Sequence, residues 1–182
     1  MTIFRTPFPH FSNHCVLALG TFDGVHIGHA AVISRAVEEA AHRRIPSAVW
    51  CFSTIPRAFF GSDIAPICTP EEKASRIAAL GVDMLVMPPV THDVLAMSPR
   101  DFVDSVVSSL SPAHIVCGFN YTFGARASGN TDTLRRLLEP HGVTLTVVEP
   151  VMHNGVPVSS TVIRELITTG NTDAAKKLLG QE

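Results

Sequence analysis

Short apolar runs alternate with helix-like segments along this chain, and this alternation limits its possible folds more than any other feature. The runs have the length of buried strands, and the segments between them repeat apolar residues at helical spacing. Strands that alternate with helices form a parallel sheet with helices on both faces, so the pattern predicts an α/β fold. We expect strands at residues 15–19, 47–52, 84–87, 115–118 and 143–148, and helices starting at His29 and covering residues 70–80, 99–110, 132–141, 160–169 and 171–179.

Two of the expected helices carry clear start signals. Thr69 is followed by Pro70 and then by Glu72, which is the pattern of a capping box with proline at the first helical position. Ser98 precedes Pro99 in a similar way. We therefore expect these two helices to begin at the prolines.

The first expected strand is followed by a glycine-rich turn and then a helix. Gly24 and Gly28 lie in this turn, where glycine lets the backbone approach a ligand closely. A strand, such a turn and a helix together direct free backbone N–H groups at whatever lies over the helix start, which suits an anion. His26 and His29 add two imidazoles that can donate hydrogen bonds to phosphate oxygens and stabilise developing charge. The segment predicts a phosphate-binding turn.

Other interpretations of the two histidines stay open. A histidine near a helix start is commonly a cap or a surface residue. Two histidines three residues apart can also bind a metal, but we see no third ligand at a convincing spacing.

A second segment near the end of the chain repeats this logic. Ser159, Ser160 and Thr161 precede an apolar helical face, and Arg164 lies one turn into it. Serine and threonine are preferred N-cap residues, so simple capping explains them. Three hydroxyls, a helix N-terminus and an arginine also make a suitable site for the β- and γ-phosphates of a nucleotide.

Composition excludes several classes of function. With 46% hydrophobic and 16% charged residues, the 182-residue chain suits one folded domain. Its net charge of −2 gives no basis for nucleic-acid binding, and no apolar stretch reaches the length of a membrane span. Residues 1–14 lack a signal-peptide pattern, and the four cysteines are scattered, without a C-x-x-C pair. We expect a cytoplasmic protein with reduced thiols and small-molecule substrates.

Two common nucleotide-binding motifs are absent from the sequence. No glycine is followed by lysine, which excludes a Walker-type phosphate loop. No two glycines lie two residues apart, which excludes the G-x-G-x-x-G fingerprint of dinucleotide-binding proteins.

Three stretches resemble one enzyme family. Residues 20–29, G-T-F-D-G-V-H-I-G-H, resemble the H-x-G-H signature of the nucleotidylyltransferase superfamily. Residues 158–164, V-S-S-T-V-I-R, resemble the I-S-S-T-x-x-R motif near the end of its domains. Residues 116–124, V-C-G-F-N-Y-T-F-G, followed by Gly129, are similar to a stretch specific to bacterial FAD synthetases. The resemblance covers nearly the whole chain, in order and without large insertions.

The resemblance implies a Rossmann-like doubly wound parallel sheet of the nucleotidylyltransferase type. It implies an FMN adenylyltransferase, which joins ATP and FMN to give FAD and pyrophosphate. Mg²⁺ would bridge phosphate oxygens with few protein ligands. Residues 1–182 would form one such domain, without the riboflavin kinase domain that follows it in the usual bifunctional protein. The chain would then be either a single-function protein, with FMN supplied by a separate riboflavin kinase, or a domain excised from a bifunctional protein.

The resemblance also implies roles for individual residues. The expected catalytic residues are His26, His29 and Arg164. The expected ATP-binding residues are Gly20, Phe22, Asp23, Gly28, His29, Ser159, Ser160, Thr161 and Arg164, and the expected flavin-binding residues are Phe52, Asn120, Tyr121 and Phe123. No residue is assigned to a metal. Asp23 could instead pin its own turn, and Tyr121 and Phe123 could be core aromatics. Trp50 is expected in the core.

The sequence departs from the family pattern at three places. The family usually has F-[ED]-P-H-P after the second strand, whereas this chain has Phe52-Ser53-Thr54-Ile55-Pro56. Many members have an arginine where Ala127 stands, while here Arg126 comes one residue earlier, and Asn120 replaces the commoner aspartate. Two other functions therefore stay open. One is nucleotidyl transfer to another small phosphorylated acceptor, and the other is a catalytically weak flavin- or nucleotide-binding protein.

Overall fold

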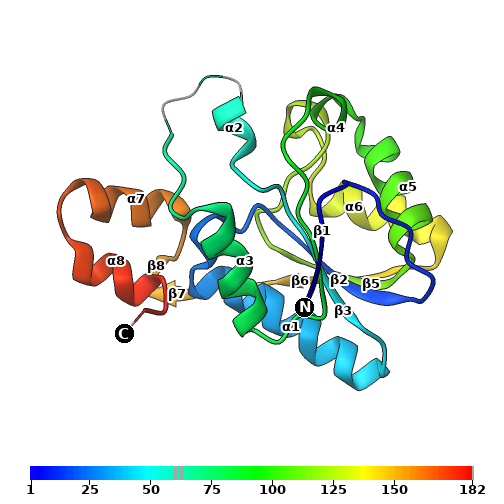
Figure 1. The fold of residues 1–182 in the computed structure, drawn as a ribbon, viewed down its shortest axis with the longest axis horizontal. Coiled ribbons are helices and arrows are strands. Elements are labelled where there is room, and N and C mark those ends of the chain that lie inside the picture. The colour runs from blue at the N-terminus through cyan, green and yellow to red at the C-terminus, as the bar shows by residue number, and fades with distance from the viewer. Residues whose placement is uncertain (60, 62–63, 182) are drawn as a thin grey trace.

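A computed structural model describes residues 1–59, 61 and 64–181 of the chain (Figure 1). In this part of the chain, six parallel strands form one sheet in the order β1-β4-β3-β2-β5-β6. A separate antiparallel hairpin consists of β7 and β8. The strands are Thr2–Phe4 (β1), Cys15–Leu19 (β2), Ser47–Trp50 (β3), Met84–Val86 (β4), Pro112–Gly118 (β5), Thr144–Val148 (β6), Met152–His153 (β7) and Val156–Pro157 (β8).

Helices connect the strands and cover the sheet (Figure 1). The α-helices are Ile27–Arg43 (α1), Pro56–Phe59 (α2), Pro70–Ala79 (α3), His92–Ala96 (α4), Pro99–Leu110 (α5), Thr131–Leu138 (α6), Ser160–Thr168 (α7) and Thr172–Leu178 (α8). Short 3₁₀ segments are Asp23–Val25 (η1), Ala125–Ala127 (η2) and Glu139–His141 (η3).

The central strand β2 shows why helices lie on both faces of the sheet. All of its residues are buried, and alternate side chains of a strand point to opposite faces. Cys15, Leu17 and Leu19 pack in a cluster with residues of α5 and α6. Val16 and Ala18 pack in a second cluster with residues of α1 and α3. The predicted doubly wound α/β fold is therefore confirmed.

The direction of the chain through the sheet reverses beside β2. From β2 the chain moves outward through β3 to β4, and it then crosses back to β5 and β6 on the other side. In open parallel sheets, ligands bind at the carboxyl ends of the strands where the order reverses in this way. The turn after β2 and the residues after β5 therefore lie where a ligand is expected.

Helix starts and other boundaries test the sequence predictions. The capping box of Thr69 and Glu72 at α3 is confirmed, and Ser98 caps α5. The prediction that a helix opens at His29 is wrong by two residues, because α1 begins at Ile27 with His26 as its N-cap. Four strand ends also differ from the prediction, two of them by only one residue, because periodicity marks the middle of an element better than its ends. β3 ends at Trp50 rather than residue 52, and β5 begins at Pro112 rather than residue 115.

Several short elements were not predicted from the sequence. They are β1, α2, α4 and the β7–β8 hairpin, and each is too short to show a period. Strand β1 is placed by pairing with β4, where Thr2 lies opposite Met84. The expected helix over residues 132–141 is divided into α6 and η3.

The remaining predictions concern the cysteines and membranes. Cys15, Cys51, Cys68 and Cys117 are all buried and form no disulfide. Within residues 1–59, 61 and 64–181, no helix is long and apolar enough to cross a membrane.

Candidate active site

The turn after β2 has a strained backbone. Phe22 and Val25 have φ angles of 49° and 44°, in the left-handed region that residues with a side chain rarely adopt, β-branched ones least of all. Such strain persists only where the surrounding contacts enforce it, and it is concentrated at ligand sites. The turn is therefore held in one shape by its own packing.

Two glycines of the turn are required by neighbours inside the protein. A Cβ atom at Gly20 would lie 2.6 Å from the ring of Phe22. A Cβ atom at Gly28 would lie 3.2 Å from the ring of His26. Both glycines thus make room for aromatic rings of the same site. The predicted contacts of Gly20, Phe22 and Gly28 with ATP stay predictions.

His26 and His29 lie against each other at the start of α1. Their ring centroids are 3.5 Å apart, and the ring planes are 16° from parallel. The Nδ1 atom of His26 accepts a 3.2 Å hydrogen bond from the backbone N–H of His29. Because Nδ1 is the acceptor, the neutral ring of His26 carries its proton on Nε2. His26 is therefore a helix cap, as one interpretation held, and its Nε2–H remains available to a ligand.

Burial keeps both imidazole rings uncharged near neutral pH. It lowers the pKa of His26 to about 4. It lowers the pKa of His29 well below its usual value, and the positive charges of His26 and Lys73 add to the effect. Among the described residues, Nδ1 of His29 is buried and has no hydrogen-bond partner. Such an orphan atom is costly, and a ligand that supplied a partner would remove the cost.

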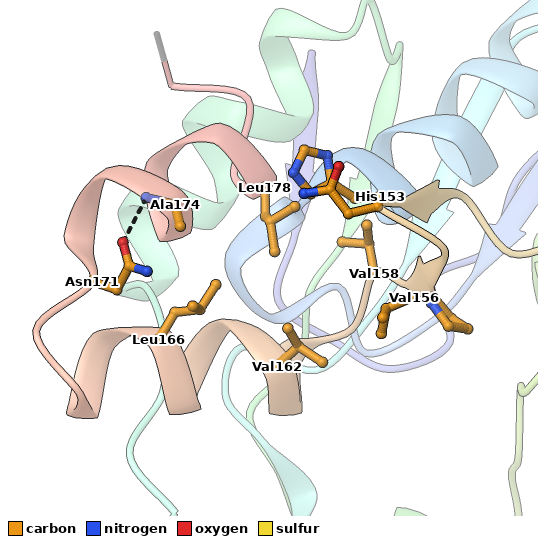
Figure 2. Close-up of a pocket in the computed structure, with 10 residues that line it drawn as sticks. His153, Val156, Val158, Val162, Leu166, Asn171, Ala174 and Leu178 are labelled. Carbon is orange, nitrogen blue, oxygen red and sulfur yellow. Dashed lines mark hydrogen bonds between the residues drawn. The ribbon is translucent and has the colours of Figure 1, made fainter.

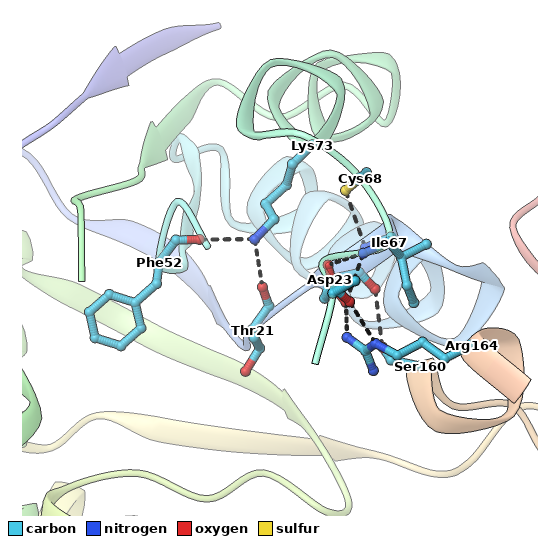
Figure 3. A network of polar contacts seen from close by, with 10 residues as sticks. Thr21, Asp23, Phe52, Ile67, Cys68, Lys73, Ser160 and Arg164 are labelled. Carbon is cyan, nitrogen blue, oxygen red and sulfur yellow. Dashed lines mark hydrogen bonds and ion pairs between the residues drawn. The ribbon is translucent and has the colours of Figure 1, made fainter. Parts of the chain in front are cut away.

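A buried carboxylate joins the two segments that the sequence singled out (Figure 3). Asp23 accepts a hydrogen bond from Nη2 of Arg164, 141 residues further along the chain, and a 3.1 Å bond from the N–H of Ile67. The Ser160 hydroxyl donates to the backbone oxygen of Asp23 over 3.1 Å. Arg164 also donates from Nε to the backbone oxygen of Ala65 over 2.9 Å. The two predicted segments therefore meet in one site.

The first turn of α7 has structural roles of its own. Ser159 is the N-cap and accepts a 3.3 Å hydrogen bond from the N–H of Val162, so the capping interpretation is correct for it. Thr161 is exposed. Arg164 is directed at Asp23, and a quarter of its side chain is exposed to solvent. Asp23 pins the neighbouring segments rather than its own turn.

Lys73, on α3, was not predicted as a site residue. Only 1% of it is exposed, and its Nζ donates to the backbone oxygens of Thr21, over 3.2 Å, and Phe52, over 2.9 Å (Figure 3). These two oxygens follow β2 and β3. The signal in the sequence was a lysine on the same helix face as Ala74 and Ile77, which is the buried face of α3.

Three of the four expected flavin-binding residues belong to an aromatic cluster. Tyr121 and Phe123 stack with centroids 5.6 Å apart, and Phe52 lies 4.9 Å from Trp50. Phe102, on α5, contacts both of these pairs. Its ring centroid lies 5.7 Å from that of Phe123 and 5.2 Å from that of Trp50. Phe123 and Trp50 are buried, so both are core aromatics. Phe52 and Tyr121 are only half-buried.

The loop after β5 is closed by its own backbone. Phe123 and Gly129 exchange two hydrogen bonds, of 3.0 and 2.9 Å. A Cβ atom at Gly129 would lie 2.8 Å from the Phe123 ring, which explains the glycine. Asn120 is exposed at the start of this loop, and Arg126 is exposed midway between Phe123 and Gly129.

The structure contains a cavity of about 310 Å³ (Figure 2). It is formed between the β7–β8 hairpin and helices α7 and α8, and Val156, Val162 and Leu178 are among its mostly apolar lining. None of the predicted site residues lines it. Within the described part of the chain, no group of three or more histidine, cysteine, aspartate or glutamate side chains could hold a metal ion.

Comparison with known proteins identifies the family. The family model for FAD synthetase matches residues 8–162, which include the strained turn, the histidine pair and the start of α7. This chain belongs to the FAD synthetase family. It is 34% identical to the bifunctional riboflavin kinase/FMN adenylyltransferase of Listeria monocytogenes, over 91% of this chain and 53% of that protein. It is also 34% identical to an FAD synthetase of Listeria monocytogenes, over 93% of this chain and 70% of that protein. The chain thus spans about half the length of its bifunctional relatives.

Solved structures agree with this fold. A crystal structure described as a macrolide-efflux protein from Streptococcus pneumoniae superimposes with a TM-score of 0.88 at 25% identity, over 99% of this chain and 60% of that one. Pantothenate synthetase from Thermus thermophilus superimposes with a TM-score of 0.57 at 16% identity, over 100% of this chain and 81% of that one. This FAD synthetase family member therefore shares its α/β fold with proteins of different names.

Proposed function

We propose that this chain transfers the adenylyl group of ATP to the phosphate of FMN, which gives FAD and pyrophosphate. The observation that carries the proposal is the pair of uncharged histidines at the start of α1, at the reversal point of the sheet. Membership of the FAD synthetase family supports the choice of substrates.

The phosphate of FMN is the nucleophile in this proposal. Its second pKa is about 6, so it is largely dianionic near neutral pH. One of its oxygens attacks the α-phosphorus of ATP, a new phosphorus–oxygen bond forms, and the bond to the β-phosphate oxygen breaks. The reaction needs no general base, which fits a site whose buried carboxylate, Asp23, is engaged by Arg164. Positioning and charge stabilisation supply the catalysis.

The two ends of the ATP triphosphate bind to different elements of the structure in this proposal. The backbone N–H groups at the start of α1 and the imidazoles of His26 and His29 hold the α- and β-phosphates, with Nε2–H of His26 as a donor. Ser159, Ser160, Thr161 and Arg164 hold the pyrophosphate end. Mg²⁺ would enter with ATP and would neutralise part of the phosphate charge.

The flavin lies over the carboxyl ends of β3 and β5. Phe52 and Tyr121 are half-buried, so each keeps surface on which a flavin ring can pack. Phe123 supports them from the buried side, and exposed Asn120 supplies a polar group. The departures at Ser53 and Ile55 lie next to this surface. We infer that they alter affinity for FMN rather than the chemistry.

The deciding experiment incubates the purified protein with MgATP and FMN, with riboflavin in place of FMN in a parallel reaction. Flavin chromatography should show FAD from FMN only, because riboflavin lacks the phosphate group that attacks ATP in this proposal. If folded, ATP-binding protein makes no FAD, the acceptor is another phosphorylated small molecule or the chain is a binding protein. FAD formation from riboflavin would show a kinase activity that this proposal does not include.

A further inference from the structure

Lys73 is a fully buried cation with an unusual set of partners. Its Nζ donates to two backbone oxygens, those of Thr21 and Phe52 (Figure 3). Among the described residues, no carboxylate forms an ion pair with Lys73. The buried carboxylate of Asp23 is paired with Arg164 instead. A buried charge without an opposite charge is costly, so carbonyl oxygens alone leave Lys73 incompletely compensated.

The position of Lys73 connects it to both halves of the proposed site. Thr21 lies in the glycine-rich turn that leads to the histidine pair, and Phe52 opens the divergent segment 52–56. Lys73 therefore contacts both the turn and this segment.

The charge of Lys73 also acts on the pKa of His29. It contributes to lowering the pKa of His29, after burial and the charge of His26. The same charge also acts to lower the pKa values of the buried thiols of Cys51 and Cys68, against the larger effect of burial. None of these groups is an anion near neutral pH, because burial raises the pKa of both thiols. A polyphosphate beside His29 would bring negative charge close to this cation.

We propose that Lys73 is a positioning residue of this site: its ammonium group ties the carboxyl ends of β2 and β3 together, and its uncompensated charge favours a nucleotide polyphosphate beside His29. The inference rests on the proposed function for the identity of the nucleotide. It concerns the binding of the phosphates and does not need FMN to be the acceptor. Opposite charges attract strongly where water is excluded, so the effect falls on MgATP and not on an uncharged nucleoside.

The test compares Lys73→Gln, which keeps a hydrogen-bond donor but loses the charge, with Lys73→Arg, which keeps the charge. Arg35→Gln is the control for loss of a positive charge, because Arg35 is a half-exposed residue further along α1. Binding of MgATP and of adenosine is measured by calorimetry, and FAD formation is followed in parallel.

We expect Lys73→Gln to weaken MgATP binding by a factor on the order of ten or more, the effect of losing a charged partner. Adenosine binding should not change, KM for ATP should rise more than kcat falls, and Lys73→Arg should retain more MgATP affinity than Lys73→Gln. Unchanged MgATP binding by folded Lys73→Gln overturns the proposal. An equal loss for MgATP and adenosine also overturns it, because that is the mark of a merely structural residue.

A measurement on the unaltered protein covers the case in which Lys73→Gln does not fold. The Nζ resonance of Lys73 should shift when MgATP is added and stay in place when adenosine is added. If the chemical shift of this resonance does not change when MgATP is added, the proposal is rejected. Failure to form FAD, with the Lys73-dependent MgATP binding intact, would reject the proposed function and leave the role of Lys73 standing.

Discussion

At the scale of single residues, the proposed chemistry depends on two histidines that stay neutral. His26 is buried, as is the Nδ1 atom of His29, so the charged form of each is disfavoured. A neutral imidazole still donates one hydrogen bond, and His26 has its donor fixed at Nε2 because Nδ1 caps α1. His29 has a buried Nδ1 without a partner among the described residues. The pair thus offers preorganised groups to developing phosphate charge.

The first prediction concerns His29. His29→Ala should lower kcat for FAD formation by a factor on the order of 10² to 10³, like the loss of one transition-state donor. His141→Ala is the matched control, because His141 is distant in the fold and bonds to Asp104 at the surface. Steady-state assays with FMN and MgATP give the comparison. Equal turnover of His29→Ala and the unaltered protein would remove His29 from the mechanism.

At the scale of elements, helix α7 is attached to the turn after β2 through one ion pair. Asp23 is buried in the turn, and Arg164 reaches it from the second turn of α7 (Figure 3). The guanidinium also holds the backbone of Ala65, in the segment that leads to α3. A single side chain therefore positions three segments, and its loss should affect the nucleotide site as well as stability.

Arg164→Ala tests this attachment. It should raise KM for ATP on the order of tenfold, the effect of losing a charge-assisted hydrogen bond. It should also lower the free energy of unfolding by about 1–3 kcal/mol, because Asp23 stays buried without its partner. Asn171→Ala, which removes only the N-cap of α8, should cost about 1 kcal/mol and leave KM unchanged. If Arg164→Ala had unaltered ATP affinity and rate, the start of α7 would have only the structural role of a capped helix.

The glycine-rich turn itself gives a second prediction at this scale. Gly24 has a φ of 80°, and a Cβ atom there would lie 2.8 Å from Ile67. Gly24→Ala should therefore lower the free energy of unfolding by about 2–4 kcal/mol, from backbone strain and overpacking together. Gly142 has a φ of 67° with no atom within 4 Å of an added Cβ, so Gly142→Ala carries the strain alone, about 1–2 kcal/mol. Urea unfolding that showed equal losses would contradict this account of the turn.

At the scale of the whole molecule, the buried histidines link folding to pH. The pKa of His26 is about 4 in the folded protein, below its usual value of 6.5. Between these values the unfolded state binds more protons, so the free energy of unfolding falls as the pH falls from 6.5 towards 4. The loss between pH 7 and pH 5 should be about 2 kcal/mol from His26. The shift of His29 acts in the same direction.

Urea unfolding at pH 7 and pH 5 measures this loss. His26→Asn keeps an acceptor at the N-cap and removes the titrating group, so its stability should fall less between the two pH values. A variant with the same pH dependence as the unaltered protein would show that His26 ionises as freely in the folded state as in the unfolded state.

Much of the sheet could be predicted from the sequence. Strand β2 and helix α5 carry strong local patterns, and the capping box at Thr69 marks the start of α3 without any long-range contact. Element ends were less accurate, as at His29, where the cap and the first helical turn share the same glycine-rich segment. Strand β1 has no such pattern, and its place is decided by pairing with β4.

The sequence by itself determined the α/β class and the two short segments that resemble one bipartite nucleotide motif, because periodicity, capping and motif strings are local properties. Only the tertiary structure decided what the polar side chains of these segments do. Asp23 meets Arg164 across 141 residues, and Lys73 meets the oxygens of Thr21 and Phe52 from another helix. Such contacts depend on how distant elements pack, and the shifted pKa values of His26 and His29 depend on the burial that this packing creates.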